Sequence, residues 1–322
     1  MNITTQIRLS CIIPTLGRGD VLLETIRMLL AQSYPAHEII VVDQTPCHDP
    51  AVLGELEILE RKRRFRWLKQ TEANASKARN AGAAVAKGEV LVFLDDDIRI
   101  EQDFLAAHAR NYRDPGVAAV AGQILKGNGD VVYHRTRESG NPELDWLYFP
   151  RNFGKRCPTT WMASGNFSIR RELFLKLGGM DERYFRGGQR EESDFALRFL
   201  RTGRRFQFDP DASILHLGIK VVPGGGSRPT GRYFGVWNHF VGHWYFIAGF
   251  ATPRTFLPLA WDCIRGHVVT RVSLQNPVVF LCRLLMLAAA VPKGYWMRLE
   301  NHLGQRTQGD PAPFSSACLF DR

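Results

Sequence analysis

Three consecutive aspartates, Asp95, Asp96 and Asp97, follow directly after the apolar run Val90–Leu94. Like charges a few ångströms apart repel strongly, so such a cluster is costly unless a cation neutralises it. Mg²⁺ and Mn²⁺ prefer hard oxygen ligands and usually share their coordination shell with the phosphates of a nucleotide. The cluster therefore predicts a divalent cation beside a nucleotide, and a cluster of solvated surface aspartates is the alternative.

A second group of acids, Glu191, Glu192 and Asp194, falls at the start of a helix expected near residues 191–202. A glutamate with an ordinary pKa of about 4.3 is ionised near pH 7 and can take a proton from a hydroxyl. Acids also stabilise a helix N-terminus through the helix dipole, which is a purely structural explanation. Because all three acids crowd the first turn rather than one face, a general base is the favoured interpretation.

Short apolar runs and helical stretches alternate over the first hundred residues. Strands are expected at Ile7–Ile13, Glu38–Asp43, Phe65–Lys69 and Val90–Leu94, with helices from Asp20 and at about 51–63 and 75–87. This alternation is typical of an α/β fold, with a Rossmann-like, mostly parallel sheet and helices on both faces. In such sheets the chemistry gathers at the carboxyl ends of the strands. Pro14, Thr15, Asp43 and the three aspartates all lie there.

The pattern is less regular after residue 98. Further helices are expected at about 101–113, 170–177 and 191–202, and further strands at about 117–122, 166–169, 204–208 and 213–217. Residues 126–158 read as loops. The glycine-rich stretch Pro223–Gly226 predicts a link or an active-site lid, which divides the chain into a catalytic domain at 1–222 and a C-terminal helical segment at 223–322.

Six blocks together carry a resemblance to a known family. They are Ser10–Thr15 (SCIIPT), Glu38–Asp43 (EIIVVD), Asn74–Gly82 (NASKARNAG), Gly88–Asp97 (GEVLVFLDDD), Ser164–Ile169 (SGNFSI) and Glu191–Arg198 (EESDFALR). In this order, and after strands where expected, they resemble the motif series of the family 2 glycosyltransferases, which have the GT-A fold. Each block alone is weak, but the series covers about two thirds of the chain.

The resemblance implies roles for the nucleotide-binding residues. Pro14 and Thr15 begin the nucleotide pocket, and Asp43 accepts a hydrogen bond from the base. Arg79 and Asn80 lie near the base and the diphosphate, and Gly82 allows close helix packing. The block containing Trp161, Ser164, Gly165 and Asn166 approaches the acceptor and the donor sugar, where glycine lets the ligand come close to the backbone.

The resemblance also implies a metal site and a base. Asp95 and Asp97 match the outer positions of the Asp-x-Asp motif, where the first contacts the ribose and metal-bound water and the second binds Mn²⁺ or Mg²⁺; Asp96 is an orienting partner. His216 matches a histidine that completes the metal or diphosphate site in some members, and a buried core histidine is the alternative. Relatives carry Asp at the position of Glu192, and the extra methylene shifts the reach of this base by about 1.5 Å. Glu191 or Asp194 could take its place.

The resemblance implies that the protein transfers a sugar with inversion of the anomeric centre. Glu192 removes the proton from an acceptor hydroxyl while the hydroxyl oxygen attacks the anomeric carbon of a nucleotide sugar. UDP is the nucleotide expected first. The acceptor is a saccharide or a lipid-linked sugar, and the family makes polysaccharides and glycolipids, often at the cytoplasmic face of a membrane.

The net charge of +10 is concentrated near the C-terminus. Residues 1–219 carry 31 basic and 28 acidic residues, whereas residues 220–322 carry 11 and 4. The same region is rich in aromatic residues and includes the apolar run Val278–Val291, interrupted only by Arg283. A helix over this run would span about 21 Å, less than the hydrocarbon core of a bilayer, which favours peripheral membrane contact over a spanning helix. A core helix flanked by surface arginines is the alternative.

Other function classes lack their motifs. A sugar-phosphate nucleotidyltransferase needs a longer basic glycine-rich loop than Gly17–Gly19. Neither the glycine fingerprint of dinucleotide enzymes nor a P-loop is present. A non-catalytic basic module that binds membrane or nucleic acid stays an alternative, although the charge pattern does not favour nucleic acid. Scattered cysteines and a polar N-terminal stretch predict a cytoplasmic protein, peripheral on the membrane. The oligomeric state is left open.

Overall fold

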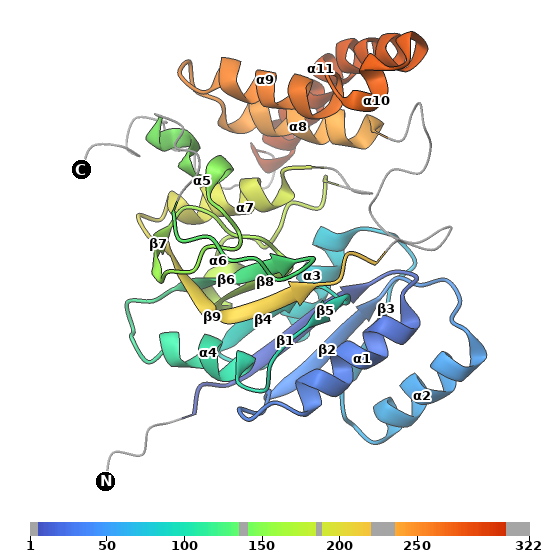
Figure 1. The fold of residues 1–322 in the computed structure, drawn as a ribbon, viewed down its shortest axis with the longest axis vertical. Helices are drawn as coiled ribbons and strands as arrows, with labels where there is room; N and C mark the ends of the chain where they lie inside the picture. The colour runs from blue at the N-terminus through green and yellow to red at the C-terminus, as the bar shows by residue number, and fades with distance from the viewer. Residues whose placement is uncertain (1–5, 135–140, 185–188, 220–235, 307–322) are drawn as a thin grey trace. The chain divides into compact units, whose positions relative to one another are not determined.

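The computed structural model describes residues 6–134, 141–184, 189–219 and 236–306 (Figure 1). The chain forms two compact units, of which the first comprises Met1–Glu182 and Arg198–Gly226 and the second Arg183–Leu197 and Ser227–Arg322. The sequence predicted a single boundary after residue 222, whereas the structure groups residues 183–197 with the C-terminal helices. The expected lid at 223–226 lies outside the described residues. The functional division at that boundary stays a prediction.

The first unit begins with the expected alternation of strands and helices. Its elements are β1 (Leu9–Thr15), α1 (Gly19–Leu30), β2 (Glu38–Asp43), α2 (Pro50–Arg61), β3 (Arg66–Lys69), α3 (Ala75–Val85) and β4 (Val90–Leu94). β1 pairs in parallel with both β2 and β4, and β2 pairs in parallel with β3. The βαβ prediction is therefore confirmed, and β2 and β4 have the predicted bounds.

The remaining strands make the sheet mixed rather than mostly parallel. The elements are β5 (Ile98–Arg99), α4 (Phe104–Asn111), β6 (Ala119–Lys126), a 3₁₀ turn (Pro142–Leu144), α5 (Asp145–Tyr148), β7 (Cys157–Thr159), β8 (Asn166–Arg170), α6 (Arg171–Lys176), α7 (Glu191–Leu200) and β9 (Phe206–His216). Within the described chain the sheet order is β3-β2-β1-β4-β8-β6-β9-β5, and β7 also pairs with β9. β8 runs antiparallel to both β4 and β6.

β9 is one strand where the sequence predicted two. Its pairing with β6 shifts register between Gly122 and Gln123, which oppose Asp209 and Ser213. The intervening residues 210–212, which include a proline, lie between the two strands that the sequence predicted. The sheet instead absorbs them in a bulge, which lets one strand continue to His216.

Helices cover both faces of the sheet, as predicted. Along β1, Cys11 and Ile13 join the core cluster under α1, α2 and α4. Ile12 points the other way, and a Cβ built on Gly82 of α3 would lie 2.5 Å from its Cγ2. Alternate strand residues point to opposite faces, so each face needs its own helical cover. Gly82 therefore permits the close helix packing that the sequence predicted.

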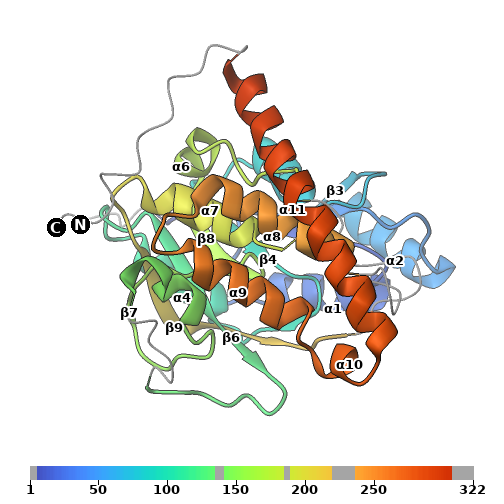
Figure 2. The same cartoon turned by 90° about the horizontal axis from the view of Figure 1, so that it is seen from above.

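The second unit is helical in its described part. It contains α8 (Trp237–Phe250), α9 (Phe256–His267), α10 (Arg271–Leu274) and α11 (Pro277–Arg306). α8 packs against α9 and α11, and α10 packs against α11 (Figure 2).

α11 is about twice as long as the apolar run that the sequence singled out. It has 30 residues and continues through Pro292. Its segment Pro277–Leu303 contains an 18-residue window with a mean hydropathy of 1.6 and is long and apolar enough to cross a membrane by length and composition, which core helices of soluble proteins can be as well. The length argument against a spanning helix is therefore wrong, because the helix does not end at the proline.

Candidate functional site

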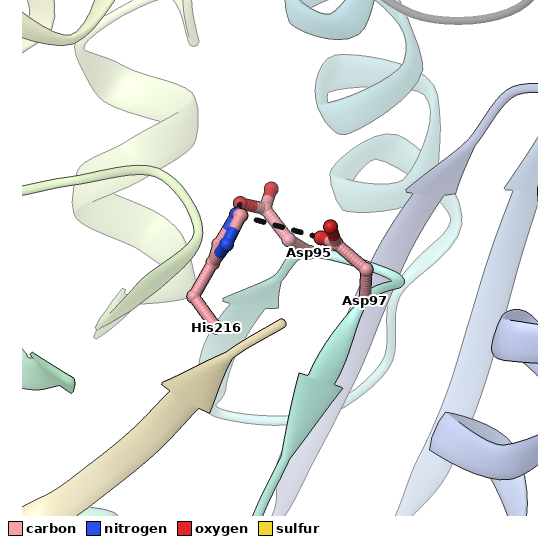
Figure 3. A group of neighbouring side chains, drawn as sticks. All are labelled: Asp95, Asp97 and His216. Carbon is pink, nitrogen blue, oxygen red and sulfur yellow. Dashed lines mark ion pairs between the residues drawn. The ribbon is translucent and has the colours of Figure 1, made fainter. Parts of the chain in front are cut away.

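Asp95, Asp97 and His216 meet at one edge of the sheet in the first unit (Figure 3). One ligand atom from each residue lies within 4.8 Å of the others. His216 Nε2 is 3.6 Å from Asp95 Oδ2 and 3.4 Å from Asp97 Oδ1. Asp95 follows β4, and the antiparallel pairing of β5 with β9 sets Ile98 opposite His216. The sheet topology thus brings together residues more than a hundred positions apart.

Two arginines neutralise the aspartates. Arg79 of α3 donates to Asp95 Oδ1 at 3.1 Å. Arg18, in the loop after β1, lies 3.0 Å from Asp96 Oδ1 and 2.7 Å from Asp97 Oδ2. Sequence reasoning assigned Arg79 to this region but missed Arg18. The only signal was its place between two glycines directly after a strand end.

The charges set the protonation of the cluster. Burial raises the pKa of Asp95, but the contact with His216 and the charge of Arg79 outweigh it, so the pKa lies below its ordinary value. The contact with Asp95 raises the pKa of His216 despite desolvation, and Asp97 adds to the effect. A cation that bound here would replace the proton on His216.

Asp96 has hydrogen-bond partners in β1 and α1. It accepts a hydrogen bond from Thr15 Oγ1 at 2.7 Å, and its backbone carbonyl accepts one from Thr25. Burial raises the pKa of Asp96 to about 6, although Arg18 and Thr15 act in the opposite direction. These contacts fit the orienting role expected for Asp96. Its cofactor contact stays a prediction.

The cluster fits a divalent cation. Two carboxylates and one imidazole are common ligands for such ions. Asp97 Oδ1 is buried and has no hydrogen-bond partner among the described residues. A Cβ on Gly165 would lie 2.3 Å from Asp95 Oδ2, so glycine leaves room for this carboxylate. Pro14, the neighbour of Thr15 on β1, pairs with Val42 in the sheet, and its nucleotide contact stays a prediction.

Asp43 is already surrounded by donors. Its Oδ1 accepts from the Thr45 amide at 2.9 Å, and its Oδ2 lies 2.6 Å from His48 Nε2 and 3.0 Å from Trp67 Nε1. The side chain is almost fully buried. Sequence reasoning missed His48 and Trp67 as its partners, and the contact of Asp43 with a base stays a prediction.

Asn80 and Asn166 have structural partners. Asn80 Nδ2 donates to Met180 O and Glu182 Oε1, and its Oδ1 accepts from the Met180 amide. Asn166 Nδ2 donates to Gln123 O and Ala212 O, while its Oδ1 faces His108 Nε2. Both amides therefore join elements of the first unit. Their ligand roles stay predictions.

The three acids at 191–194 stand in the first turn of α7. Asp194 is buried, accepts a hydrogen bond from Tyr184 at 3.2 Å and lies 3.6 Å from Arg298 Nη1. Glu191 and Glu192 are half-buried. These residues belong to the second unit and the aspartate cluster to the first, and the choice of base stays a prediction.

The family model described as Glycosyl transferase family 2 matches residues 10–178, more than half of the chain. The chain belongs to glycosyltransferase family 2. The match spans β1 to α6 and therefore includes both aspartates of the cluster but not His216. The family resemblance and the GT-A-type fold expected from the sequence are confirmed.

Relatives extend this result. The glucosyl-dolichyl phosphate glucuronosyltransferase of Haloferax volcanii is 28% identical over 203 residues, which are 60% of this chain and 63% of that protein. The chain therefore spans less than two thirds of that relative. Staphylococcus aureus TarS 1-349 matches with a TM-score of 0.59 and 15% identity, over 97% of this chain and 95% of that one. GalNAc-T7, solved with UDP, GalNAc and Mn²⁺, matches with a TM-score of 0.55 and 17% identity, over 81% of this chain and 55% of that one.

Proposed function

We propose that this member of family 2 is an inverting glycosyltransferase that moves a sugar from a UDP-linked donor to a hydroxyl of a saccharide or lipid-linked acceptor. The product would belong to a polysaccharide or glycolipid. The observation that carries the proposal is the grouping of Asp95, Asp97 and His216 at the sheet edge of a family 2 fold. A divalent cation at that place suits a diphosphate leaving group.

The proposed cofactor is Mn²⁺, with Mg²⁺ as the second choice, held by Asp95, Asp97 and His216. Mn²⁺ is favoured because an imidazole ligand suits Mg²⁺ poorly, since Mg²⁺ prefers oxygen ligands and bound water. GalNAc-T7 was solved with Mn²⁺ and UDP, which supports Mn²⁺ as the metal and UDP as the nucleotide. When bound, such a cation neutralises charge on a departing nucleoside diphosphate.

Arg18 and Arg79 would bind the diphosphate. The Nε atom of each is buried and has no hydrogen-bond partner among the described residues. A buried donor without an acceptor is unfavourable, and phosphate oxygens would satisfy it. The two guanidinium groups that now neutralise the aspartates would then neutralise the donor as well.

Glu192 is the proposed base, with Glu191 and Asp194 as alternatives. The acceptor oxygen forms a bond to the anomeric carbon, the bond from that carbon to the phosphate oxygen breaks, and the acceptor proton passes to the carboxylate. Attack from the face opposite the leaving group inverts the anomeric centre. Asp194 fits the role less well because Tyr184 and Arg298 already contact its carboxylate.

The name of one relative supports the proposed class of acceptor. The Haloferax protein is named for a dolichyl phosphate-linked sugar, which supports a lipid-linked acceptor here. With such an acceptor, we propose that the enzyme works as a peripheral protein at the cytoplasmic face of a membrane. No nucleic acid partner is expected.

A donor panel tests the proposal. Purified protein is incubated with UDP-, GDP- and dTDP-sugars, with Mn²⁺, Mg²⁺ or a chelator, and nucleoside diphosphate release is measured. We expect release only with the metal, and most with a UDP-sugar. Release of pyrophosphate from a sugar phosphate and a nucleoside triphosphate would instead indicate a nucleotidyltransferase. No binding and no turnover across the panel would contradict the enzyme proposal.

A further inference from the structure

The outer face of α11 is apolar and exposed. Val278, Leu281, Leu285, Trp296, Leu299 and Leu303 are each about half or more exposed. Successive members are three, four, eleven, three and four residues apart. Eleven residues make about three helical turns, so all six lie on one stripe along the helix. By contrast, only a few scattered large apolar side chains are exposed in the described part of the first unit, among them Ile58 of α2. A continuous apolar stripe of this length marks an interaction surface.

The opposite face of α11 packs against other helices of the second unit. Val279, Met286 and Ala290 are buried. A Cβ built on Gly294 would lie 2.6 Å from the Tyr245 amide nitrogen, so the two backbones approach closely. Asn301 donates to the Tyr245 hydroxyl at 2.9 Å. α11 is therefore attached to α8 along much of its length.

Arg283 does not interrupt the apolar stripe. Its Nη1 donates to His267 O at 2.9 Å, Thr270 Oγ1 at 2.6 Å and Ser273 Oγ at 2.7 Å. The guanidinium is thus turned inward and bonded to neutral oxygens. From Pro277 to Pro292 the exposed residues of α11 carry no charge.

The exposed charges in the described part of the second unit are mostly basic. Arg265, Arg271 and Lys293 are exposed on its helices, and Arg254 is exposed in the turn before α9. Glu300 is exposed on α11, and Asp262 is paired with Arg190. A symmetric dimer through the stripe would bring two basic surfaces together, whereas anionic lipid headgroups complement them. The charge pattern therefore favours a bilayer over a second copy of the chain.

A spanning orientation is unfavourable for this helix. Moving α11 into the hydrocarbon would separate Arg283 from its three oxygen partners or bury them with it. Either outcome places a charged or unsatisfied polar group in lipid. A helix that lies in the interface keeps these contacts and buries only its outer face.

We propose that the outer face of α11 docks in the plane of an anionic bilayer surface, with its leucines and Trp296 in the headgroup and upper acyl region. Lys293 of α11 and Arg271 of α10, which packs against α11, would contact lipid phosphates. This docking is independent of sugar transfer, because no donor, metal or acceptor takes part in it.

Vesicle flotation tests the docking. The purified full chain is mixed with vesicles of phosphatidylcholine alone or with phosphatidylglycerol, without donor or metal. We expect flotation with the anionic vesicles, reduced by high salt. The double variant Leu281→Glu, Leu285→Glu should weaken binding to the anionic vesicles by about tenfold or more, since each change places a charge in the apolar interface. The matched control is Ile58→Glu, an exposed apolar residue of the first unit, which should bind as the wild type does.

Three results would overturn the proposal. They are no flotation of the wild type, flotation unchanged in the double variant, or resistance of the bound protein to alkaline carbonate, which would indicate a spanning helix. A dimer in light scattering that the double variant separates, without vesicle binding, would assign the stripe to a second copy. Metal-dependent donor binding by each variant shows that the first unit is folded and keeps this test separate from that of the enzyme.

Discussion

The aspartate cluster of the first unit and the helix α11 of the second bury charge in opposite ways. In the first, Asp95, Asp96 and Asp97 lie among Arg18 and Arg79, so the site contains many paired charges. In the second, Arg283 is bonded to neutral oxygens and its helix leaves leucines exposed. The first arrangement suits a small charged ligand, and the second suits an apolar surface. The comparison predicts that a change at the aspartate cluster leaves bilayer binding intact, and that a change on the outer face of α11 leaves metal and donor binding intact.

The largest effect is expected for Asp97→Asn. The change keeps the shape but removes the charge, and we expect metal-dependent transfer to fall on the order of 10⁴-fold because metal affinity and charge neutralisation are both lost. Calorimetry with Mn²⁺ and UDP measures the loss of metal affinity. Asp103→Asn, at an exposed position outside the site, is the control.

Vesicle binding by Asp97→Asn should match the wild type if the comparison holds. Unchanged affinity for Mn²⁺ and UDP would remove Asp97 from the metal site.

Glu192→Gln tests whether the second unit takes part in the chemistry. We expect donor binding to persist while transfer falls roughly 10²–10⁴-fold, because the base is lost. Single-turnover measurements beside donor titrations separate the two. Glu172→Gln, which changes an acid in the first turn of α6, is the matched control.

A loss of transfer in Glu192→Gln with donor binding kept would show that a residue of the second unit acts on the acceptor. Near-normal turnover would move the role to Glu191 or Asp194.

A smaller effect is expected when the pH is lowered, and it concerns the stability of the second unit. Desolvation lowers the pKa of His239, His243 and His267, that of His267 to about 4. In the unfolded chain these histidine side chains take up protons below their ordinary pKa near 6.5, whereas in the folded unit they stay neutral to lower pH. The free energy of unfolding therefore falls as the pH drops from 6.5 toward 4. The loss at pH 5 is on the order of 2 kcal/mol for such a histidine.

The first unit contains His108, whose pKa burial lowers to about 4, and also His216, whose raised pKa has the opposite effect on stability. We therefore expect amides of α8 and α9 to lose hydrogen-exchange protection at pH 5 before those of β1 and β4. His267→Gln should reduce this difference. Earlier loss in the first unit would reverse the comparison.

Strand positions in the first half were predictable because they depend on local pattern. β2 and β4 lie where their apolar runs do, and Asp43 and Asp95 follow at the strand ends. The mixed half of the sheet was harder. The stretch at 209–212 has the composition of a turn, yet pairing with β6 keeps it within one strand.

The candidate site was predictable in part. The aspartates were named from their charge and their place after a strand, and Arg79 and His216 from the family motifs; the structure brings them together. Arg18, His48 and Trp67 were not named, because nothing in their local sequence shows which carboxylate each will contact. Such pairs depend on how distant strands and loops meet.

The sequence by itself determined the strand and helix alternation, the family, and the acids at the strand ends, since these follow from periodicity and motif. Only the tertiary structure decided where the long polar side chains point. Arg283 interrupts the apolar run in the sequence, but in the structure its guanidinium is buried and donates to the Thr270 and Ser273 hydroxyls and the His267 carbonyl. A buried guanidinium needs several acceptors, and only the folded chain brings them together.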